Sequence, residues 1–188
     1  MQPWVRYVIC GVAGLALGAG AAVQRVRSGA FGASIAIGPW TTGKDFGTTG
    51  ADAYTRATVA WRGLLALPAH EVRYYTAAVD SAGAPLDGKC RYRVSGRAVP
   101  AKWWSVTLYG DDSYLVPNQA NIFSIESAHV PDPAGWAIEV APAQQAGLWL
   151  PTGRVDRFNL TLRAYLPDDG GAGNLTRDQL PSIVKEGC

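Results

Sequence analysis

The chain has 188 residues, of which 48% are hydrophobic and 17% are charged, and its formal net charge is +2. A chain of this length forms one domain, or one domain with an appendage, and buries roughly 70% of its unfolded surface. The small net charge and the absence of a dense Lys/Arg cluster argue against nucleic-acid binding. No cofactor is predicted, because no phosphate-binding glycine motif follows a predicted strand.

The N-terminus carries an apolar segment that predicts a membrane anchor. Residues 7–24 contain no charged side chain, and a helix needs about 17 to 25 apolar residues to span a bilayer. The length of the run favours an uncleaved anchor over a signal peptide cut near Ala19-Gly20-Ala21. Gly14 and Gly18 would allow two such helices to pack closely. We therefore assign residues 1–27 to an anchor or signal segment.

Two cysteines outside this segment, Cys90 and Cys188, predict a disulfide. An isolated cysteine pair behind an apolar leader indicates an oxidising compartment, although two unrelated thiols are the alternative. Cys10 lies within the apolar run and is expected to be inert. The expected location is the bacterial inner membrane, with a single span and the C-terminal domain in the periplasm. A cleaved leader would instead release the domain into the periplasm.

The next segments predict a linker and a helix. Residues 28–50 are rich in Gly, Ser and Thr and predict a linker, with Trp40 docking on the domain. Residues 52–67 predict the one substantial helix of the soluble part, with Asp52 as its N-cap and Pro68 at its end. Its expected apolar stripe consists of Tyr54, Ala57, Trp61, Leu64 and Leu65.

From His70 onward the apolar period changes to two, which predicts β-strands. Turns rich in Pro and Gly separate these strands, so the predicted fold is mostly β: an antiparallel sandwich or jelly roll over residues 51–188, with the helix leading. The apolar stretch 147–151 is expected to be a loop, and a flexible tract and a tail follow Pro167. The predicted strands cover residues 71–80, 90–95, 102–110, 114–116, 122–130, 136–140 and 155–166.

The strand at 102–110 carries the densest packing signal. One of its faces is wholly apolar and is expected to point into the core: Trp104, Val106 and Leu108. The other face is aromatic and hydroxylic, and it would either contribute to a binding site or be covered by another element: Trp103, Ser105, Thr107 and Tyr109.

Several motifs occur in a characteristic order along these strands. They are Trp-Trp-Ser-Val-Thr-Leu-Tyr at 103–109, Tyr-Leu-Val-Pro-Asn at 114–118, Trp-Leu-Pro at 149–151 and Phe-Asn-Leu-Thr-Leu-Arg-Ala-Tyr at 158–165. Together with the patterns at 85–88 and 92–96, they resemble the family called domain of unknown function 1214. The resemblance covers about residues 70–166 plus the tail.

This resemblance implies a jelly-roll-like β-sandwich. The chain is similar to short, membrane-anchored bacterial members that lack the N-terminal partner domain, family 1254. Because the family name itself records no activity, the resemblance implies no catalytic residues.

Motifs for catalysis or metal binding are not found. His70-Glu71 begins a zincin motif, but Tyr74 stands where the second histidine is needed, and His129 is the one other histidine. No GxSxG motif is present. The adjacent acids Asp111-Asp112 follow a strand and are interpreted as turn residues, rather than as a glycosidase pair. No metal site and no catalytic residue are predicted.

Aromatic side chains supply the main ligand-binding candidates. Aromatic faces with nearby hydroxyls suit sugar rings or flat apolar ligands, although burial in the core is the alternative. This set comprises Trp103, Tyr109, Tyr114 and Trp149.

Arginines on the predicted strands are the second set of candidates. Arg91, Arg93 and Arg163 alternate with core positions. They would capture an anion or a carboxylate, or they would be solvated or paired with Asp87 and Asp156.

These features favour a membrane-tethered envelope module. It would reach the inner membrane through its N-terminal helix and bind a glycan, a lipid or an envelope protein without catalysis. A hydrolase with a loop site near Asp111, Asn118 and Asn121 is one alternative. A structural assembly partner that pairs through Gly14 and Gly18 is another.

Overall fold

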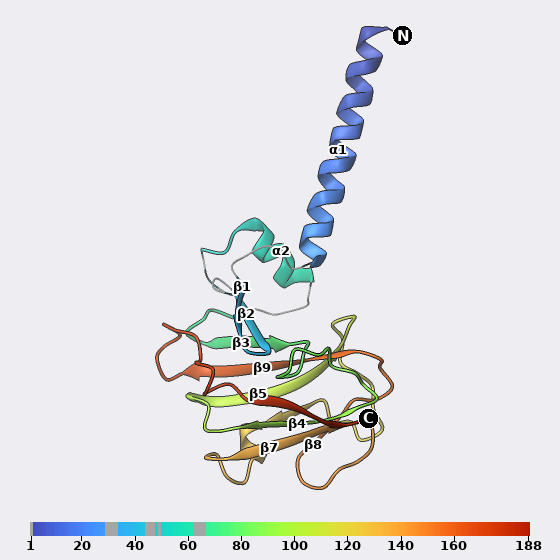
Figure 1. Ribbon diagram of the computed structural model, residues 1–188. Coiled ribbons are helices and arrows are strands. Elements are labelled where there is room, and N and C mark those ends of the chain that lie inside the picture. Colours follow the sequence, from blue (N-terminus) through green and yellow to red (C-terminus); the bar gives the residue numbers. More distant parts are fainter. Residues whose placement is uncertain (1, 29–33, 44–47, 49, 62–66) are drawn as a thin grey trace.

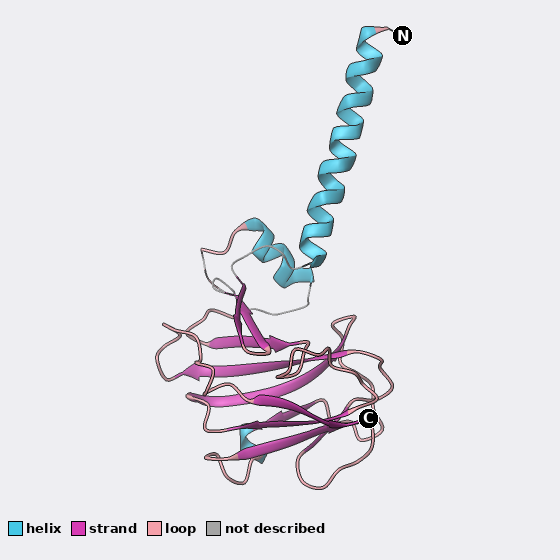
Figure 2. Cartoon of the chain, viewed as in Figure 1, coloured by secondary structure: helices cyan, strands magenta, loops and turns pink. Residues whose placement is uncertain are grey.

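The computed structural model describes residues 2–28, 34–43, 48, 50–61 and 67–188. A long helix, α1 (Pro3–Ser28), projects from a body made of strands (Figures 1 and 2). Pro3–Gln24 has a mean hydropathy of 1.7 and an exposed surface, so it is long and apolar enough to cross a membrane. A signal sequence near an N-terminus has the same properties, so these properties identify a candidate span.

Two sheets form the body. The larger sheet has six antiparallel strands in the spatial order β1 (Ser34–Ile37), β2 (Trp40–Gly43), β3 (Val72–Ala77), β9 (Phe158–Pro167), β5 (Ala101–Gly110) and β6 (Ser124–Glu126). The smaller sheet has the order β10 (Ser182–Gly187), β4 (Arg91–Gly96), β7 (Trp136–Ala141) and β8 (Trp149–Pro151). The pairing of β7 with β8 is parallel, and the other pairings are antiparallel. The predicted mostly-β class is confirmed, and the jelly-roll strand order stays a prediction.

The core lies between the inner faces of β5 and β9 and the smaller sheet. Trp104, Val106 and Leu108 are buried, as predicted, and pair in register with Ala164, Leu162 and Leu160 of β9. This follows from the period of two, because alternate side chains of a strand share one face. The indole of Trp104 stacks on that of Trp136 from the smaller sheet, with ring centroids 4.4 Å apart.

Part of the segment expected to be a linker forms the hairpin β1–β2. Gly38 has φ +63° at its turn, a conformation that glycine adopts without steric cost. Trp40 is fully buried, and its indole N–H donates a 2.7 Å hydrogen bond to the carbonyl of Pro181. Thr41 pairs with Thr76, which joins the hairpin to β3. The prediction that Trp40 docks on the domain is confirmed.

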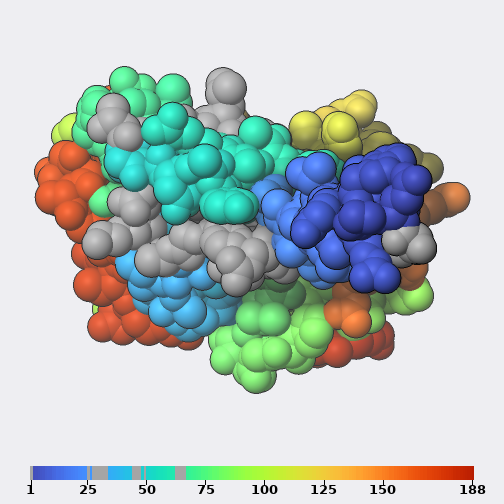
Figure 3. Space-filling model, turned by 90° about the horizontal axis from the view of Figure 1, so that it is seen from above, coloured from blue at the N-terminus to red at the C-terminus, as the bar shows by residue number. Residues whose placement is uncertain are grey.

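The leading helix α2 (Ala53–Trp61) lies near the base of α1, and Figure 3 shows both from the end at which α1 projects. Asp52 is its N-cap as predicted, since its carboxylate accepts a 2.7 Å hydrogen bond from the Thr55 amide. The predicted apolar stripe is wrong within the described part of the helix. Tyr54 and Trp61 are exposed, whereas Thr55 and Thr58 are buried. The predicted positions Leu64 and Leu65 lie outside the described residues.

Four strand predictions need correction. The predicted strand 114–116 is limited to an isolated antiparallel bridge between Tyr109 and Leu115. The stretch 147–151 contains the short strand β8, whereas a loop was expected. The predicted strand 122–130 is limited to β6 and is followed by a 3₁₀ helix, η1 (Ser127–His129). The tail forms β10, which pairs with β4. β6 and β8 have three residues each, which is too short to show a clear period. β10 buries Ile183 alone among its six residues, so it shows no alternation of buried and exposed positions.

The disulfide between Cys90 and Cys188 is confirmed. Cys90 directly precedes β4 and Cys188 directly follows β10, so the bridge closes the end of this antiparallel pair. Cys10 is a free, exposed thiol on α1.

Candidate functional site

The face of the larger sheet that points away from the core carries aromatic and polar side chains, some buried and some half-buried, and we call it the outer face. Strand register places four residues in one row across β3, β9, β5 and β6: Tyr74, Arg163, Ser105 and Glu126. The adjacent rows contain the pairs Trp103–Tyr165 and Thr107–Thr161. Trp103 and Tyr109 therefore share this face, as the period of two predicted.

Arg163 is the centre of this face. Its Nη1 donates a 3.1 Å hydrogen bond to Thr107 Oγ1, and its Nη2 donates a 2.7 Å hydrogen bond to Tyr109 Oη. The guanidinium carbon also lies 5.4 Å from the ring centroid of Tyr109 and 6.0 Å from that of Tyr74. Arginine interacts favourably with aromatic faces within about 6 Å. Three side chains thus hold the guanidinium over the sheet.

Tyr74 contributes its ring to this arrangement as a neutral phenol. Burial raises the pKa of Tyr74 above its ordinary value, because a phenolate would lose its hydration there. Its hydroxyl oxygen accepts a 3.1 Å hydrogen bond from the amide of Leu67. The ring therefore keeps one position beside Arg163 at neutral pH.

Trp103 and Tyr165 form the aromatic side of the outer face. Their ring centroids are 4.8 Å apart, and the rings meet edge to face at 65°. Both side chains are half-buried, and Ser105 and Thr107 between the larger residues are buried. The outer face is thus partly covered, and Trp103, Tyr109, Arg163 and Tyr165 retain accessible surface.

The other predicted aromatic residues lie elsewhere. Tyr114 follows β5 in a turn and is 75% exposed. Trp149 belongs to β8 of the smaller sheet, where its indole N–H donates a 3.0 Å hydrogen bond to the carbonyl of Ala141. The four predicted aromatic side chains are therefore not one cluster. Trp103 and Tyr109 are the two that share a face.

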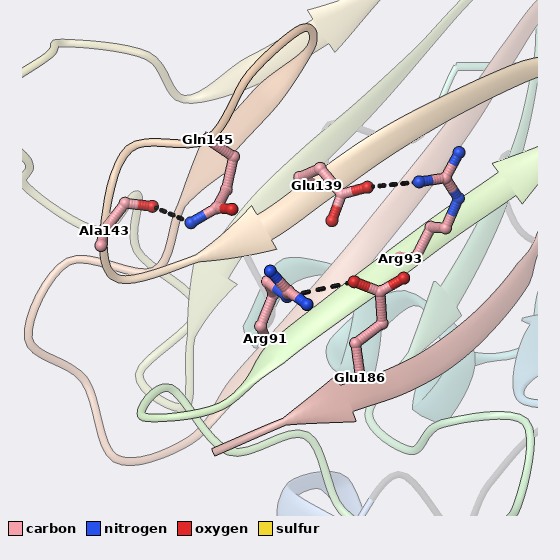
Figure 4. Close-up of polar contacts among 6 residues, drawn as sticks. All are labelled: Arg91, Arg93, Glu139, Ala143, Gln145 and Glu186. Carbon is pink, nitrogen blue, oxygen red and sulfur yellow. Dashed lines mark hydrogen bonds and ion pairs between the residues drawn. The ribbon is translucent and has the colours of Figure 1, made fainter.

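Arg91 and Arg93 lie on β4 of the smaller sheet and form ion pairs (Figure 4). Arg91 contacts Glu186 of β10 at 3.1 Å, and Arg93 contacts Glu139 of β7 at 2.8 Å. The expected partners Asp87 and Asp156 are wrong for both arginines. Lys89 forms the ion pair with Asp156, at 2.9 Å.

The residues considered for a hydrolase site hold turns. The Asn118 side chain donates to the carbonyls of Val116 and Ile122 and accepts from the amide of Ile122. Asp112 accepts a hydrogen bond from the amide of Tyr114. Asn121 adopts a positive φ of 53° in the same loop. Within the described ranges, no three His, Cys, Asp or Glu side chains gather as a metal site would require.

Sequence reasoning missed Tyr74, Glu126 and Tyr165 as members of the outer face. It considered Arg163 only as one of three outward arginines. An available signal was the position of Arg163 near the middle of the longest predicted strand, between Leu162 and Ala164. A long strand favours a central position in its sheet, where a side chain has cross-strand neighbours on both sides.

Comparisons with known proteins identify a family and a fold. A protein-family model described as "Protein of unknown function (DUF1214)" matches residues 71–169. The crystal structure of the VPA0106 protein from Vibrio parahaemolyticus is similar, with a TM-score of 0.58 and 20% identity over 98% of this chain. A putative uncharacterized protein from Burkholderia cenocepacia aligns with a TM-score of 0.44 and 16% identity over 61% of this chain.

This chain spans 46% of the Vibrio protein and 30% of the Burkholderia protein. No curated protein matches it.

Proposed function

This chain belongs to the DUF1214 family of proteins of unknown function, and from this premise we propose that it is a membrane-tethered, non-catalytic binding module of the bacterial envelope. Its sandwich binds an envelope glycan on the outer face. The observation that carries this proposal is the set of half-buried Trp103, Tyr165 and Tyr109 around Arg163. Aromatic faces with adjacent hydroxyl and charged groups are typical of sites that bind sugar rings.

Tethering at the inner membrane is supported by α1, and a periplasmic location is supported by the disulfide. Disulfides persist in oxidising compartments such as the periplasm. Intact mass of the protein purified from membranes tests the tether. A mass that includes residues 1–27 supports an uncleaved anchor, and a mass that lacks them contradicts it.

Glycan binding is tested with the full chain in detergent on an array of bacterial glycans. We expect binding that is lost in Trp103→Ala and retained in Trp149→Ala. Trp149 is a matched control, because it is also a half-buried tryptophan but lies on the smaller sheet. Circular dichroism shows whether each variant is folded. Equal loss in both folded variants, or no loss in either, would contradict the outer face as the binding site.

A further inference from the structure

Arg163 differs from the paired arginines of the smaller sheet in its partners. Arg91 and Arg93 each contact a glutamate. Arg163 has two hydroxyl acceptors and two aromatic neighbours, and no carboxylate within ion-pair distance in the described part of the chain. Hydroxyls accept hydrogen bonds but carry no negative charge, so these partners do not neutralise the charge of the guanidinium.

Some donors of Arg163 remain available. A guanidinium has five N–H donors, and the two hydroxyls accept two of them. Arg163 is half-buried, so part of its side chain is open to solvent and to a ligand.

The fixed position of Arg163 favours a planar anion. Thr107, Tyr109 and Tyr74 already hold the guanidinium in place, so less conformational entropy is lost when an anion binds. Carboxylates pair with guanidinium groups through two parallel hydrogen bonds. Glu126 lies in the same row two strands away, or about 10 Å. A single cation with a carboxylate at that distance suits a singly charged group, such as a carboxylate, better than a phosphate dianion.

The neighbouring aromatic pair places a ring next to this anion site. Trp103 and Tyr165 lie one row away from Arg163 on the same face, which is about 7 Å along the strand. A sugar ring that packs against Trp103 therefore brings a substituent over the guanidinium.

We infer that the ligand is an acidic glycan of the uronic-acid type and that Arg163 binds its carboxylate. This inference rests on the proposed function, and it adds the chemical class of the ligand. Arg163 would supply charge and orientation, and Trp103 would supply the contact with the sugar ring.

Oligogalacturonate and its methyl ester test this inference, because they share one sugar backbone and differ in charge. Calorimetry with the full chain in detergent should give at least about tenfold weaker binding of the ester. Arg163→Gln should weaken binding of the acid by a similar factor and leave the ester unchanged. Arg163→Lys keeps the charge without the planar fork and should give an intermediate affinity.

Arg93→Gln is the control variant, since it removes an arginine from the other sheet and should leave both affinities unchanged. The comparison of the two probes on the unmodified protein does not depend on the folding of any variant.

Three outcomes would overturn the inference. Equal binding of acid and ester, with both lost in Trp103→Ala, would leave the proposed function intact and remove the role of Arg163. Acid binding that salt weakens but Arg163→Gln does not would indicate general attraction of a polyanion. Binding of neither probe, with array binding that still depends on Trp103, would exclude uronic acids while the glycan-binding function stands.

Discussion

Arg163 Nη2 donates a 2.7 Å hydrogen bond to Tyr109 Oη, which joins two residues 54 positions apart in the sequence. The antiparallel pairing of β5 with β9 makes this contact possible. It fixes the direction of the guanidinium on the outer face, and it links the stability of the sheet to the geometry of the proposed site.

Tyr109→Phe should lower the stability of the sheet and weaken ligand binding at the proposed site. The variant removes the hydroxyl acceptor and keeps the ring, so the free energy of unfolding should fall by about 1 kcal/mol. Binding of oligogalacturonate should weaken several-fold, because Arg163 loses one of its two hydroxyl partners. Urea denaturation and calorimetry measure the two effects. Unchanged affinity in a folded Tyr109→Phe protein would contradict the positioning role of this hydroxyl.

Glu126→Gln should strengthen binding of an acidic ligand. The carboxylate lies in the same row as Arg163, with Ser105 between them, and it repels an anion bound there. The expected gain in affinity is roughly twofold to fivefold at low ionic strength. It is smaller at 0.15 M salt, because salt screens the repulsion between charges about 10 Å apart. Affinity measured at two salt concentrations checks this, and weaker binding of the acid would contradict it.

Leu162→Ala should strongly destabilise the fold. Leu162 is fully buried between the sheets and pairs with Val106. Removing a buried leucine costs about 2–5 kcal/mol through lost burial and a residual cavity. Val184→Ala on the exposed side of β10 is the control, since Val184 is 50% exposed. Its expected effect is within about 0.5 kcal/mol. Urea denaturation of both variants compares the two positions.

Loss of the disulfide should lower stability by roughly 2–4 kcal/mol, because the bridge closes a loop between residues 98 positions apart. Cys188→Ala and the double variant with Cys90→Ala should have similar midpoints, since both lack the same bond. Cys10→Ala is the control and should match the unmodified protein. Intact mass before and after reduction and alkylation reports the bridge. Alkylation of Cys90 and Cys188 without reduction would contradict it.

Asp52 should make the stability of α2 depend on pH. The Thr55 amide, which donates to its carboxylate, lowers the pKa of Asp52 below its ordinary value. A depressed carboxyl pKa contributes stability above the unfolded-state pKa, and this stability is lost as the pH falls through the folded-state pKa. Asp52→Asn keeps a capping oxygen without a titrating group. The protection of the α2 amides from exchange should therefore fall further between pH 6 and pH 3 in the unmodified protein than in Asp52→Asn.

The sequence predicts burial best in a long strand, where the period of two alone decides which side chains face the core. The inner face of β5 follows from alternation alone, because Trp104, Val106 and Leu108 are apolar and the strand is long. The disulfide and the docking of Trp40 were also predictable, since each depends on a rare residue type in an otherwise uninformative segment.

The centre of the candidate site was less predictable, because it depends on the pairing of distant strands. Arg163 meets Tyr109 and Tyr74 only after β9 is placed between β3 and β5 in one register. Spacing within one strand carries no information about that register. The position of Trp149 on the other sheet has the same origin, since it depends on a short parallel pairing with β7.

The hairpin β1–β2 sets how far the sandwich can travel from the anchor. α1 ends at Ser28 and β1 begins at Ser34, so six peptide steps (34 − 28) separate them. Six such steps extend to about 22 Å at most. Trp40 and its hydrogen bond to Pro181 hold the hairpin in the body, so no further chain can be released without unfolding. When α1 spans a bilayer as proposed, the domain stays within a thin layer beside the lipid. A glycan must therefore enter that layer to be bound.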